Sequence, residues 1–241
     1  MMSRFCRLSV LAVMFAICAN AADKEQVTSF TLPRPKTDGA SQLDLWATNY
    51  YVYLATQSEG GIPLLDAAGH PLGPVLSAKD WCLGGIEGTI KVGDTTYNFD
   101  RTKPPPQVNC KKVVKFNVGS NRYAKAKGPF GDGVKGFGLV PWRSLATDPN
   151  TIPTGTVLFI PDAVGTKLPG GLVHDGYFFA ADVGSHIDAN HIDVFTGTSE
   201  EPVLRFVRSS QDKQFKAFIV PDASIMQAFS DLHTRWIFGQ P

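Results

Sequence analysis

Three short stretches decide the fold: TDPNTIPTGT at residues 147–156, YFFAADVG at residues 177–184 and HIDVF at residues 191–195. Their apolar residues include Val, Ile, Phe and Tyr and are bounded by Gly, Pro and Asn, a pattern that is typical of β-strands joined by turns. Asp182 follows directly on an apolar run, and Asp193 has apolar neighbours on both sides. The three stretches therefore predict strands that carry acidic side chains in apolar surroundings.

These acidic residues are candidates for acid–base chemistry. An ionised carboxyl group in an apolar strand costs free energy unless it is paired, hydrogen-bonded or protonated. Burial also raises the pKa of a carboxyl group toward the range that a general acid needs near neutral pH. Asp193 fits this description best, and a structural aspartate that accepts backbone N–H groups is the alternative. Asp148 before Pro149 could instead begin an Asx turn, and Asp182 could brace the turn at Gly184.

The rest of the chain predicts a mainly β protein. Short apolar runs are broken by turn residues, and the 23 Gly and 17 Pro leave little room for long helices. Strands are expected at residues 45–54, 89–92, 113–117, 156–160, 177–181, 192–195, 203–207 and 215–220.

The C-terminal residues 222–241 predict one helix. Asp222 can cap it, and apolar side chains at helical spacing would form its packing face. These side chains are Ile225, Phe229, Leu232 and Trp236. The glycine-rich stretch 119–138 follows no obvious strand and opens no obvious helix, so it predicts a turn-rich loop rather than a phosphate-binding loop.

The N-terminus predicts export. Residues 1–21 have the form of a secretory signal peptide, with Arg4 and Arg7 before an apolar run and Ala19-Asn20-Ala21 as the cleavage site. Cys18 follows bulky Ile17, which makes a poor lipidation motif, so the periplasm or the extracellular space is favoured over a lipid anchor. No apolar run is long enough to span a membrane.

Cleavage would leave two cysteines, Cys82 and Cys110, which predict one disulfide in an oxidising compartment. Two buried free thiols are the alternative. The bridge would stabilise the fold by roughly 3 kcal/mol. The net charge of the full chain is only +1, so the protein has no basic field to attract nucleic acid or anionic lipid.

The order and spacing of the three acidic stretches resemble the three-aspartate (3D) domain over about residues 140–197. This domain forms the catalytic double-psi β-barrel of membrane-bound lytic transglycosylase A and of the stationary-phase-survival muralytic proteins. Residues 47–51 more loosely resemble its first strand. The resemblance implies a six-stranded double-psi β-barrel with a disulfide-held, loop-rich insertion over residues 44–221. A flexible lead-in at residues 22–43 would precede the barrel, and the C-terminal helix would pack on it.

The resemblance also implies a peptidoglycan lytic transglycosylase, which acts on glycan strands and needs no cofactor or metal. Asp193 lies in a His-x-Asp setting that also resembles expansins and family-45 endoglucanases, and it would be the catalytic acid. Asp182 would polarise the site, and Asp148 would brace it. The candidates for substrate contact are Tyr50, Tyr51, Trp142 and His191. Packing in the barrel core is the alternative for the three larger aromatic side chains.

The chain departs from the family pattern after Asp182. Ser185 replaces a second Gly, and Asp188 stands where Lys is usual, which would remove a cation from the sugar site. This departure keeps two alternatives open: a non-hydrolytic, expansin-like wall-binding module and a glycoside hydrolase with two carboxylates. Asp175 and Asp188 lie beside turn residues and are predicted to be solvated. The spacing of His186, Asp188 and His191 only weakly indicates a metal site, because strands and turns do not fix three ligands on one face.

Overall fold

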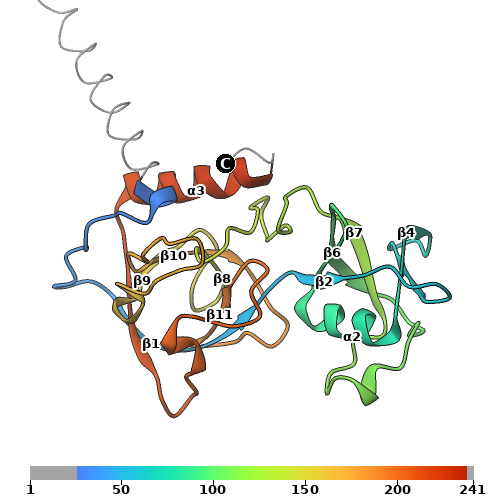
Figure 1. The fold of residues 1–241 in the computed structure, drawn as a ribbon. Helices are drawn as coiled ribbons and strands as arrows, with labels where there is room; N and C mark the ends of the chain where they lie inside the picture. Colours follow the sequence, from blue (N-terminus) through green and yellow to red (C-terminus); the bar gives the residue numbers. More distant parts are fainter. Residues whose placement is uncertain (1–25, 238–241) are drawn as a thin grey trace, which may run out of the picture.

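The computed structural model describes residues 26–237 and has two lobes (Figure 1). The larger lobe is a β-barrel, and the chain between the first two barrel strands in sequence forms the smaller lobe. The predicted signal peptide, residues 1–21, lies outside the described residues.

Six strands close the barrel in the order β1, β11, β8, β10, β9, β12. They are β1 (Gln42–Tyr50), β8 (Ser144–Thr147), β9 (Val157–Phe159), β10 (Tyr177–Asp182), β11 (His191–Phe195) and β12 (Phe215–Ile219). β1 pairs in parallel with β11, and β8 pairs in parallel with β10, whereas the other four pairs are antiparallel. The mainly β, six-stranded barrel implied by the resemblance is confirmed.

Alternation along the strands divides the barrel residues between two faces. Ala47, Leu145, Ile192 and Val194 are fully buried in one apolar cluster that fills the barrel. Asp193 lies between Ile192 and Val194 on β11. Because these two side chains point into the barrel, that of Asp193 must point to the outer face. The same apolar pattern that closes the barrel thus places a carboxyl group on its outside.

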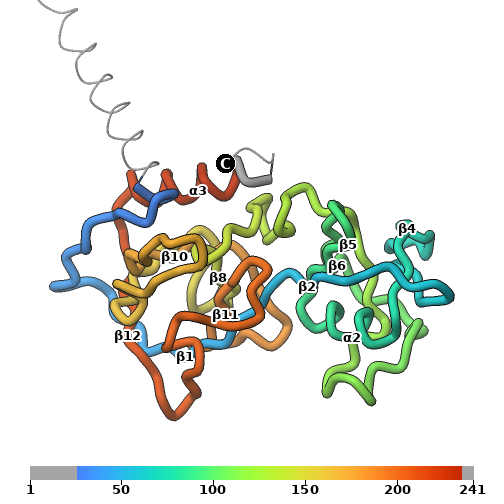
Figure 2. Tube along the Cα trace, in the orientation of Figure 1, coloured from blue at the N-terminus to red at the C-terminus, as the bar shows by residue number. Residues whose placement is uncertain are grey.

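The C-terminal helix lies across the barrel as predicted (Figures 1 and 2). It is α3 (Ala223–Ile237), and Oδ1 of Asp222 accepts hydrogen bonds from the backbone N–H groups of Ser224 and Ile225 at 2.9 and 3.1 Å. Phe229 and Leu232 are buried against the outer face of β9 and β10. The side chain of Trp236 lies outside the described residues.

The N-terminal segment differs from the predicted flexible lead-in. Val27 is fully buried and Leu32 is nearly so, both in the apolar cluster beneath α3. In Figure 2 this segment, in blue, runs along the start of α3 before it enters β1. The segment is therefore part of the packed structure from residue 26 onward.

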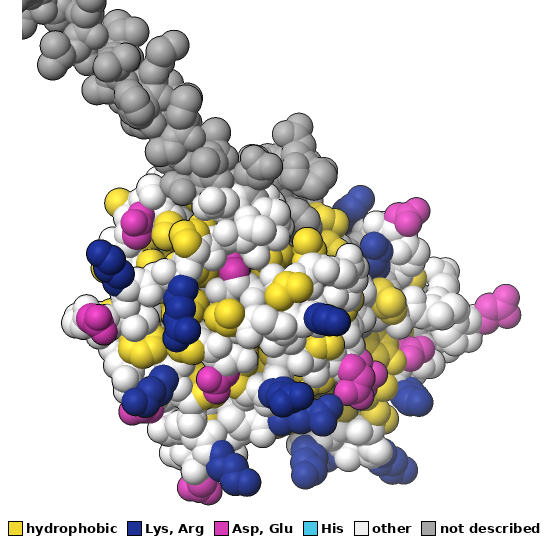
Figure 3. Space-filling view, turned by 60° about the vertical axis from the view of Figure 1, so that its left-hand side comes forward, with side chains coloured by type: hydrophobic (Ala, Val, Ile, Leu, Met, Phe, Trp, Pro, Cys, Tyr) yellow, Lys and Arg dark blue, Asp and Glu magenta, His cyan; other side chains and the backbone are white. Residues whose placement is uncertain are grey.

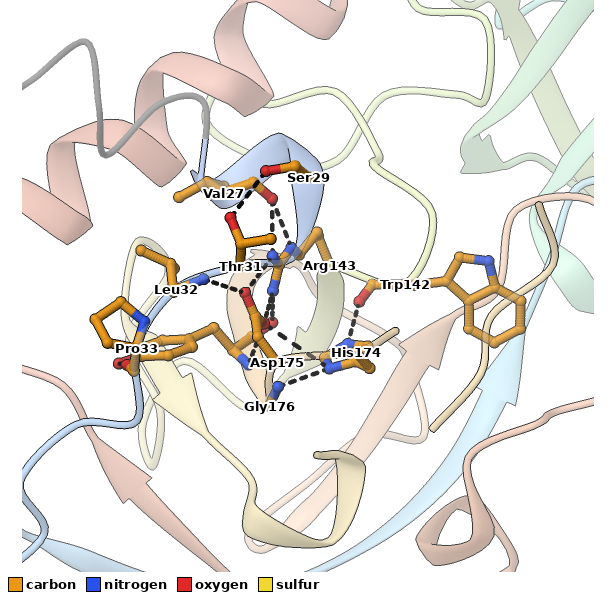
Figure 4. A network of polar contacts seen from close by, with 11 residues as sticks. Val27, Ser29, Thr31, Leu32, Pro33, Trp142, Arg143, His174, Asp175 and Gly176 are labelled. Carbon is orange, nitrogen blue, oxygen red and sulfur yellow. Dashed lines mark hydrogen bonds and ion pairs between the residues drawn. The ribbon is translucent and has the colours of Figure 1, made fainter. Parts of the chain in front are cut away.

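A buried ion pair holds the segment in place (Figure 4). Arg143, directly before β8, contacts both carboxylate oxygens of Asp175, at 2.5 and 2.8 Å, and donates to the carbonyl of Val27. Asp175 also accepts from the backbone N–H groups of Leu32 and Tyr177. The prediction that Asp175 is solvated is wrong, because an arginine 32 residues away supplies a buried partner.

The smaller lobe contains two sheets and a helix. Its first sheet has the order β2 (Tyr53–Ala55), β5 (Thr89–Val92), β6 (Thr95–Thr102) and β7 (Asn121–Lys125). β3 (Ile62–Leu65) and β4 (Pro71–Leu76) form the second sheet, and α2 (Ala78–Glu87) follows them. A disulfide between Cys82 and Cys110 joins α2 to the 3₁₀ turn η1 (Cys110–Lys112), so the predicted pairing is confirmed.

Helix α2 was not predicted, although its ends carry recognisable signals. The hydroxyl of Ser77 accepts a hydrogen bond from the backbone N–H of Asp80 at 3.1 Å and donates to its carboxylate at 2.8 Å. Gly88 follows the helix with a φ of 75°, a left-handed conformation that commonly ends helices. A Ser-x-x-Asp start and a Gly stop are thus the features that could have revealed it.

Two predicted strands were wrong. Residues 113–117 form a loop after η1, and residues 203–207 overlap the 3₁₀ turn η3 (Arg205–Arg208). The predicted strand 45–54 is divided between β1 in the barrel and β2 in the smaller lobe. The glycine-rich stretch 119–138 begins with β7 and is turn-rich only after it.

The disulfide closes a loop across a sequence separation of 28 residues. Because a cross-link restricts the unfolded chain, we expect its removal in a Cys82→Ala, Cys110→Ala variant to lower the free energy of unfolding by about 3 kcal/mol. Urea denaturation with and without reductant measures this effect. The wild-type midpoint should fall in reductant, whereas the variant should not respond. Equal wild-type midpoints in both conditions would contradict a stabilising bridge.

Charged side chains of both signs are interspersed over the barrel face seen in Figure 3. Within residues 26–237, no helix is long and apolar enough to cross a membrane.

Candidate functional site

Four residues lie side by side across four adjacent barrel strands. They are Thr48 of β1, Asp193 of β11, Ala146 of β8 and Asp182 of β10, and we call them the acidic row. Paired residues on neighbouring strands share a face of the sheet, and two strand spacings put about 10 Å between the Cα atoms of Asp193 and Asp182. Ala146 lies between the two acids in this row and is itself buried in an apolar cluster with Tyr50 and Phe195.

A bulge in β10 turns Asp182 toward this face. Ala180 pairs with Leu145, but the next pair joins Asp182 to Ala146, so Ala181 is an extra residue. Ala180 is buried in the barrel core, and strict alternation would point Asp182 the same way. The extra residue reverses that direction and brings the second carboxyl group to the face that carries Asp193.

Asp193 is half-buried and is hydrogen-bonded to Thr48, its neighbour in the acidic row. When ionised, its Oδ1 accepts a hydrogen bond from the hydroxyl of Thr48 at 2.9 Å. Burial raises the pKa of Asp193 to about 7, and donation from Thr48 to the carboxylate, where it occurs, opposes this effect only in part. A substantial fraction of Asp193 is therefore protonated at neutral pH, as a general acid requires.

Asp182 is the second acid with a raised pKa. Its carboxylate accepts hydrogen bonds from the backbone N–H of Val183 at 2.9 Å and from the hydroxyl of Tyr50 at 3.2 Å. Burial raises the pKa of Asp182 to about 7, and the negative charge of Asp193 adds to the shift. The two acids therefore influence each other across Ala146, so that ionisation of one disfavours ionisation of the other.

Asp148 lies outside the acidic row and connects two loops. Its Oδ1 accepts from the backbone and side-chain N–H groups of Asn150, and its Oδ2 accepts from the backbone N–H of Ala189, each at 2.9 Å. These hydrogen bonds lower the pKa of Asp148, so it is ionised at neutral pH. The residue forms the Asx turn and also ties it to the loop that enters β11.

The smaller lobe contributes a third acid, which the sequence analysis missed. Glu87, the last residue of α2, accepts a hydrogen bond from the backbone N–H of Tyr51 at 3.1 Å. Burial, together with the charges of Asp193 and Glu200, raises the pKa of Glu87 to about 7. No motif around Glu87 is visible in the sequence, and the helix that ends at this residue was not predicted.

His191 lies two residues before Asp193 on β11, where it pairs with Trp46 of β1. It is only 7% exposed, and its ring stacks on Trp46 with 3.5 Å between the centroids. Its Nε2 lies 2.9 Å from the hydroxyl of Thr48, and its Nδ1 lies 3.2 Å from the carbonyl oxygen of His186. Both ring nitrogens are thus engaged within the protein, and the predicted substrate contact of His191 stays a prediction.

The three predicted aromatic contacts have different surroundings. Tyr50 is 9% exposed, packs on Phe195 and presents its hydroxyl to Asp182. Tyr51 is half-buried, and burial followed by the charge of Glu87 raises its pKa to about 12. Trp142 packs in the barrel core and is 7% exposed, which favours the core-packing alternative over sugar stacking.

The departures from the family pattern lie in the loop before β11. Ser185 contacts Nδ1 of His186 at 3.0 Å, and the ring of His186 contacts Phe116 of the smaller lobe. Asp188 is exposed, as predicted. Among the described residues, no three His, Cys, Asp or Glu side chains are grouped to hold a metal ion.

Fold and site together define a six-stranded β-barrel protein with a cluster of carboxyl groups on its outer face. Residues 143–206 match the family model of the 3D domain, and this segment carries Asp148, Asp182 and Asp193. The resemblance to the 3D domain seen in the sequence is therefore confirmed over this segment. No curated protein sequence matched the chain.

Several solved structures are similar to this one at low sequence identity. E. coli MltA with bound chitohexaose is 16% identical, with 75% of this chain and 74% of that chain covered and a TM-score of 0.48. A membrane-bound lytic murein transglycosylase from Agrobacterium tumefaciens is 13% identical, with 78% of each chain covered and a TM-score of 0.46. The lytic transglycosylase LtgG of Burkholderia pseudomallei is 17% identical, with 73% and 71% covered and a TM-score of 0.39.

Proposed function

We propose that this protein is a peptidoglycan lytic transglycosylase with Asp193 as its general acid and base. The observation that carries the proposal is the placement of Asp193, a half-buried acid with a pKa of about 7, in the acidic row of a 3D domain. A carboxyl group with this pKa can both donate and accept a proton near neutral pH.

The reaction needs one group that performs both proton transfers. Protonated Asp193 donates to the oxygen that joins N-acetylmuramic acid to N-acetylglucosamine, and the C–O bond at the anomeric carbon breaks. The resulting carboxylate takes the proton from the 6-hydroxyl of the muramic acid, whose oxygen attacks the anomeric carbon. The product is a 1,6-anhydro end, and Asp193 is protonated again. Because the nucleophile belongs to the substrate, the protein needs no covalent intermediate.

The remaining predicted residues would support Asp193. Asp182, held by Tyr50 and Val183, would stabilise positive charge that develops at the anomeric carbon. Asp148 would fix the loop that enters β11. Tyr51, next to the Glu87 contact, would line the sugar site. Glycan strands of peptidoglycan would be the substrate, and we infer that the chain is exported to the cell envelope, with residues 1–21 as its signal.

Digestion of purified sacculi tests this function. Soluble products released by the wild-type protein are identified by mass spectrometry, and sedimentation measures the protein bound to sacculi. We expect anhydro-muropeptides. Muropeptides with reducing ends would instead indicate a two-carboxylate hydrolase, and binding without soluble products would indicate an expansin-like module. Either of these results would overturn the proposal.

The pH dependence should follow the acid form of Asp193. Because its pKa is about 7, the acid form is complete at lower pH, and its fraction falls tenfold per unit above the pKa. We expect the initial rate of sacculus solubilisation to decline in the same way above about pH 7. A rate that is constant from pH 6 to pH 9 would show that the essential acid is a different group.

A further inference from the structure

A chain of hydrogen bonds leads from the backbone to Asp193. The carbonyl oxygen of His186 contacts Nδ1 of His191, and Nε2 of His191 contacts the hydroxyl of Thr48. The same hydroxyl contacts Oδ1 of Asp193. The three distances are 3.2, 2.9 and 2.9 Å. Each contact needs one hydrogen. The number of hydrogens on these groups therefore determines which atom donates in each hydrogen bond.

The direction can be worked out from the first contact. A carbonyl oxygen only accepts, so Nδ1 of His191 must carry a hydrogen. Burial lowers the pKa of His191, so its ring is neutral at neutral pH and Nε2 is left as an acceptor. The single hydrogen of the Thr48 hydroxyl then points to His191. The contact between Thr48 and Asp193 must therefore take its hydrogen from Asp193.

We propose that His191 is a positioning residue that acts through the Thr48 hydroxyl to hold Asp193 as a carboxylic acid. This role rests on the proposed function of Asp193 and is distinct from binding the substrate. The stack of His191 on Trp46 and the backbone contact at Nδ1 hold the ring in the required orientation.

The hydrogen bonds between His191, Thr48 and Asp193 rearrange when Asp193 gives up its proton. The Thr48 hydroxyl can then turn and donate to the new carboxylate, which leaves Nε2 of His191 without a donor. That loss makes the ionised state of Asp193 less favourable and favours return of the proton from the substrate hydroxyl. No proton is gained or lost by His191 or Thr48 over the full cycle.

The surrounding charges act in the same direction. Asp193 faces Asp182 of β10, Tyr50 of β1 and Glu87 of α2, and the acids among them disfavour a further negative charge. The negative charge of Asp188 opposes the effect of burial on His191 only in part. None of these groups donates a hydrogen to Oδ1 of Asp193; within residues 26–237, the hydrogen-bond partner of this oxygen is the Thr48 hydroxyl.

The tautomer of His191 tests the proposal without any measurement of activity. In ¹⁵N-histidine NMR at pH 7, we expect a neutral ring with its hydrogen on Nδ1. Signals of His191 are assigned by their loss in His191→Phe, and His186→Gln serves as the matched control because it keeps the backbone carbonyl. A neutral ring with its hydrogen on Nε2 would overturn the proposal. If sacculi are not cleaved at all, the proposed function fails, but this measurement still reports the direction of the hydrogen bonds between His191, Thr48 and Asp193.

The pH–rate profile gives a second, independent test. His191→Phe keeps an aromatic ring against Trp46 but frees the Thr48 hydroxyl to stabilise ionised Asp193, so the alkaline limb should move down by about one pH unit. Thr48→Ser should keep the wild-type midpoint. In a Thr48→Val background, His191→Phe should cause no further shift, because the connecting hydroxyl is gone. An unchanged or raised midpoint in His191→Phe, or an equal shift in both backgrounds, would overturn the proposal.

Discussion

Replacing Asp193 with Asn should lower the rate of sacculus solubilisation by roughly 10²–10⁴-fold, the usual contribution of a positioned general acid. The amide has nearly the same shape as the carboxyl group and can remain in contact with Thr48, so the barrel should be unchanged. It cannot, however, donate a proton to a leaving oxygen and take one back. Release of soluble muropeptides from labelled sacculi measures the loss.

The matched control is Asp162→Asn. Asp162 is an exposed aspartate in the 3₁₀ turn η2 (Pro161–Ala163), and it lies outside the acidic row. This variant should retain the wild-type rate. If Asp193→Asn kept more than about a tenth of the wild-type rate, Asp193 would not be the general acid.

The second large effect is on stability. Arg143→Met should lower the free energy of unfolding by about 3–5 kcal/mol, because it leaves the buried carboxylate of Asp175 without its partner. It also removes the donors to the backbone carbonyls of Val27 and Tyr177. Chemical denaturation monitored by circular dichroism measures the change.

Two further variants give this experiment its controls. Arg205→Met removes an exposed arginine in η3 and should change the free energy of unfolding by less than about 0.5 kcal/mol. The double variant Arg143→Met, Asp175→Leu removes both charges and should recover part of the loss. An effect of Arg143→Met as small as that of Arg205→Met would show that the ion pair does not stabilise the fold.

Much of the barrel could be predicted because its strands carry local signals. The apolar alternation around Asp193 is visible in five consecutive residues, and it correctly separates the buried neighbours Ile192 and Val194 from the acid. The capped helix α3 has an equally local signal at Asp222. In the smaller lobe, β5 was predicted at residues 89–92, but β6 and β7 were not, and α2 was missed although its cap signals at Ser77 and Gly88 were present.

The parts that could not be predicted depend on distant partners. The direction of Asp182 depends on a bulge, which appears only when β10 is paired with β8. The burial of Asp175 depends on Arg143, and the position of Glu87 depends on how α2 meets the barrel at Tyr51. His191 illustrates the same limit, because its contacts with Trp46 and Thr48 appear only when β11 is paired with β1.

The central claim is that Asp193 keeps its proton near neutral pH, and a direct titration tests it best. Wild-type protein with ¹³C-labelled aspartate carboxyl groups is followed by NMR from pH 3 to pH 9, and the Asp193 signal is identified by its absence in Asp193→Asn. We expect a titration midpoint near pH 7. A midpoint near the ordinary aspartate value of 3.8 would contradict the account, because Asp193 would then have no proton to give.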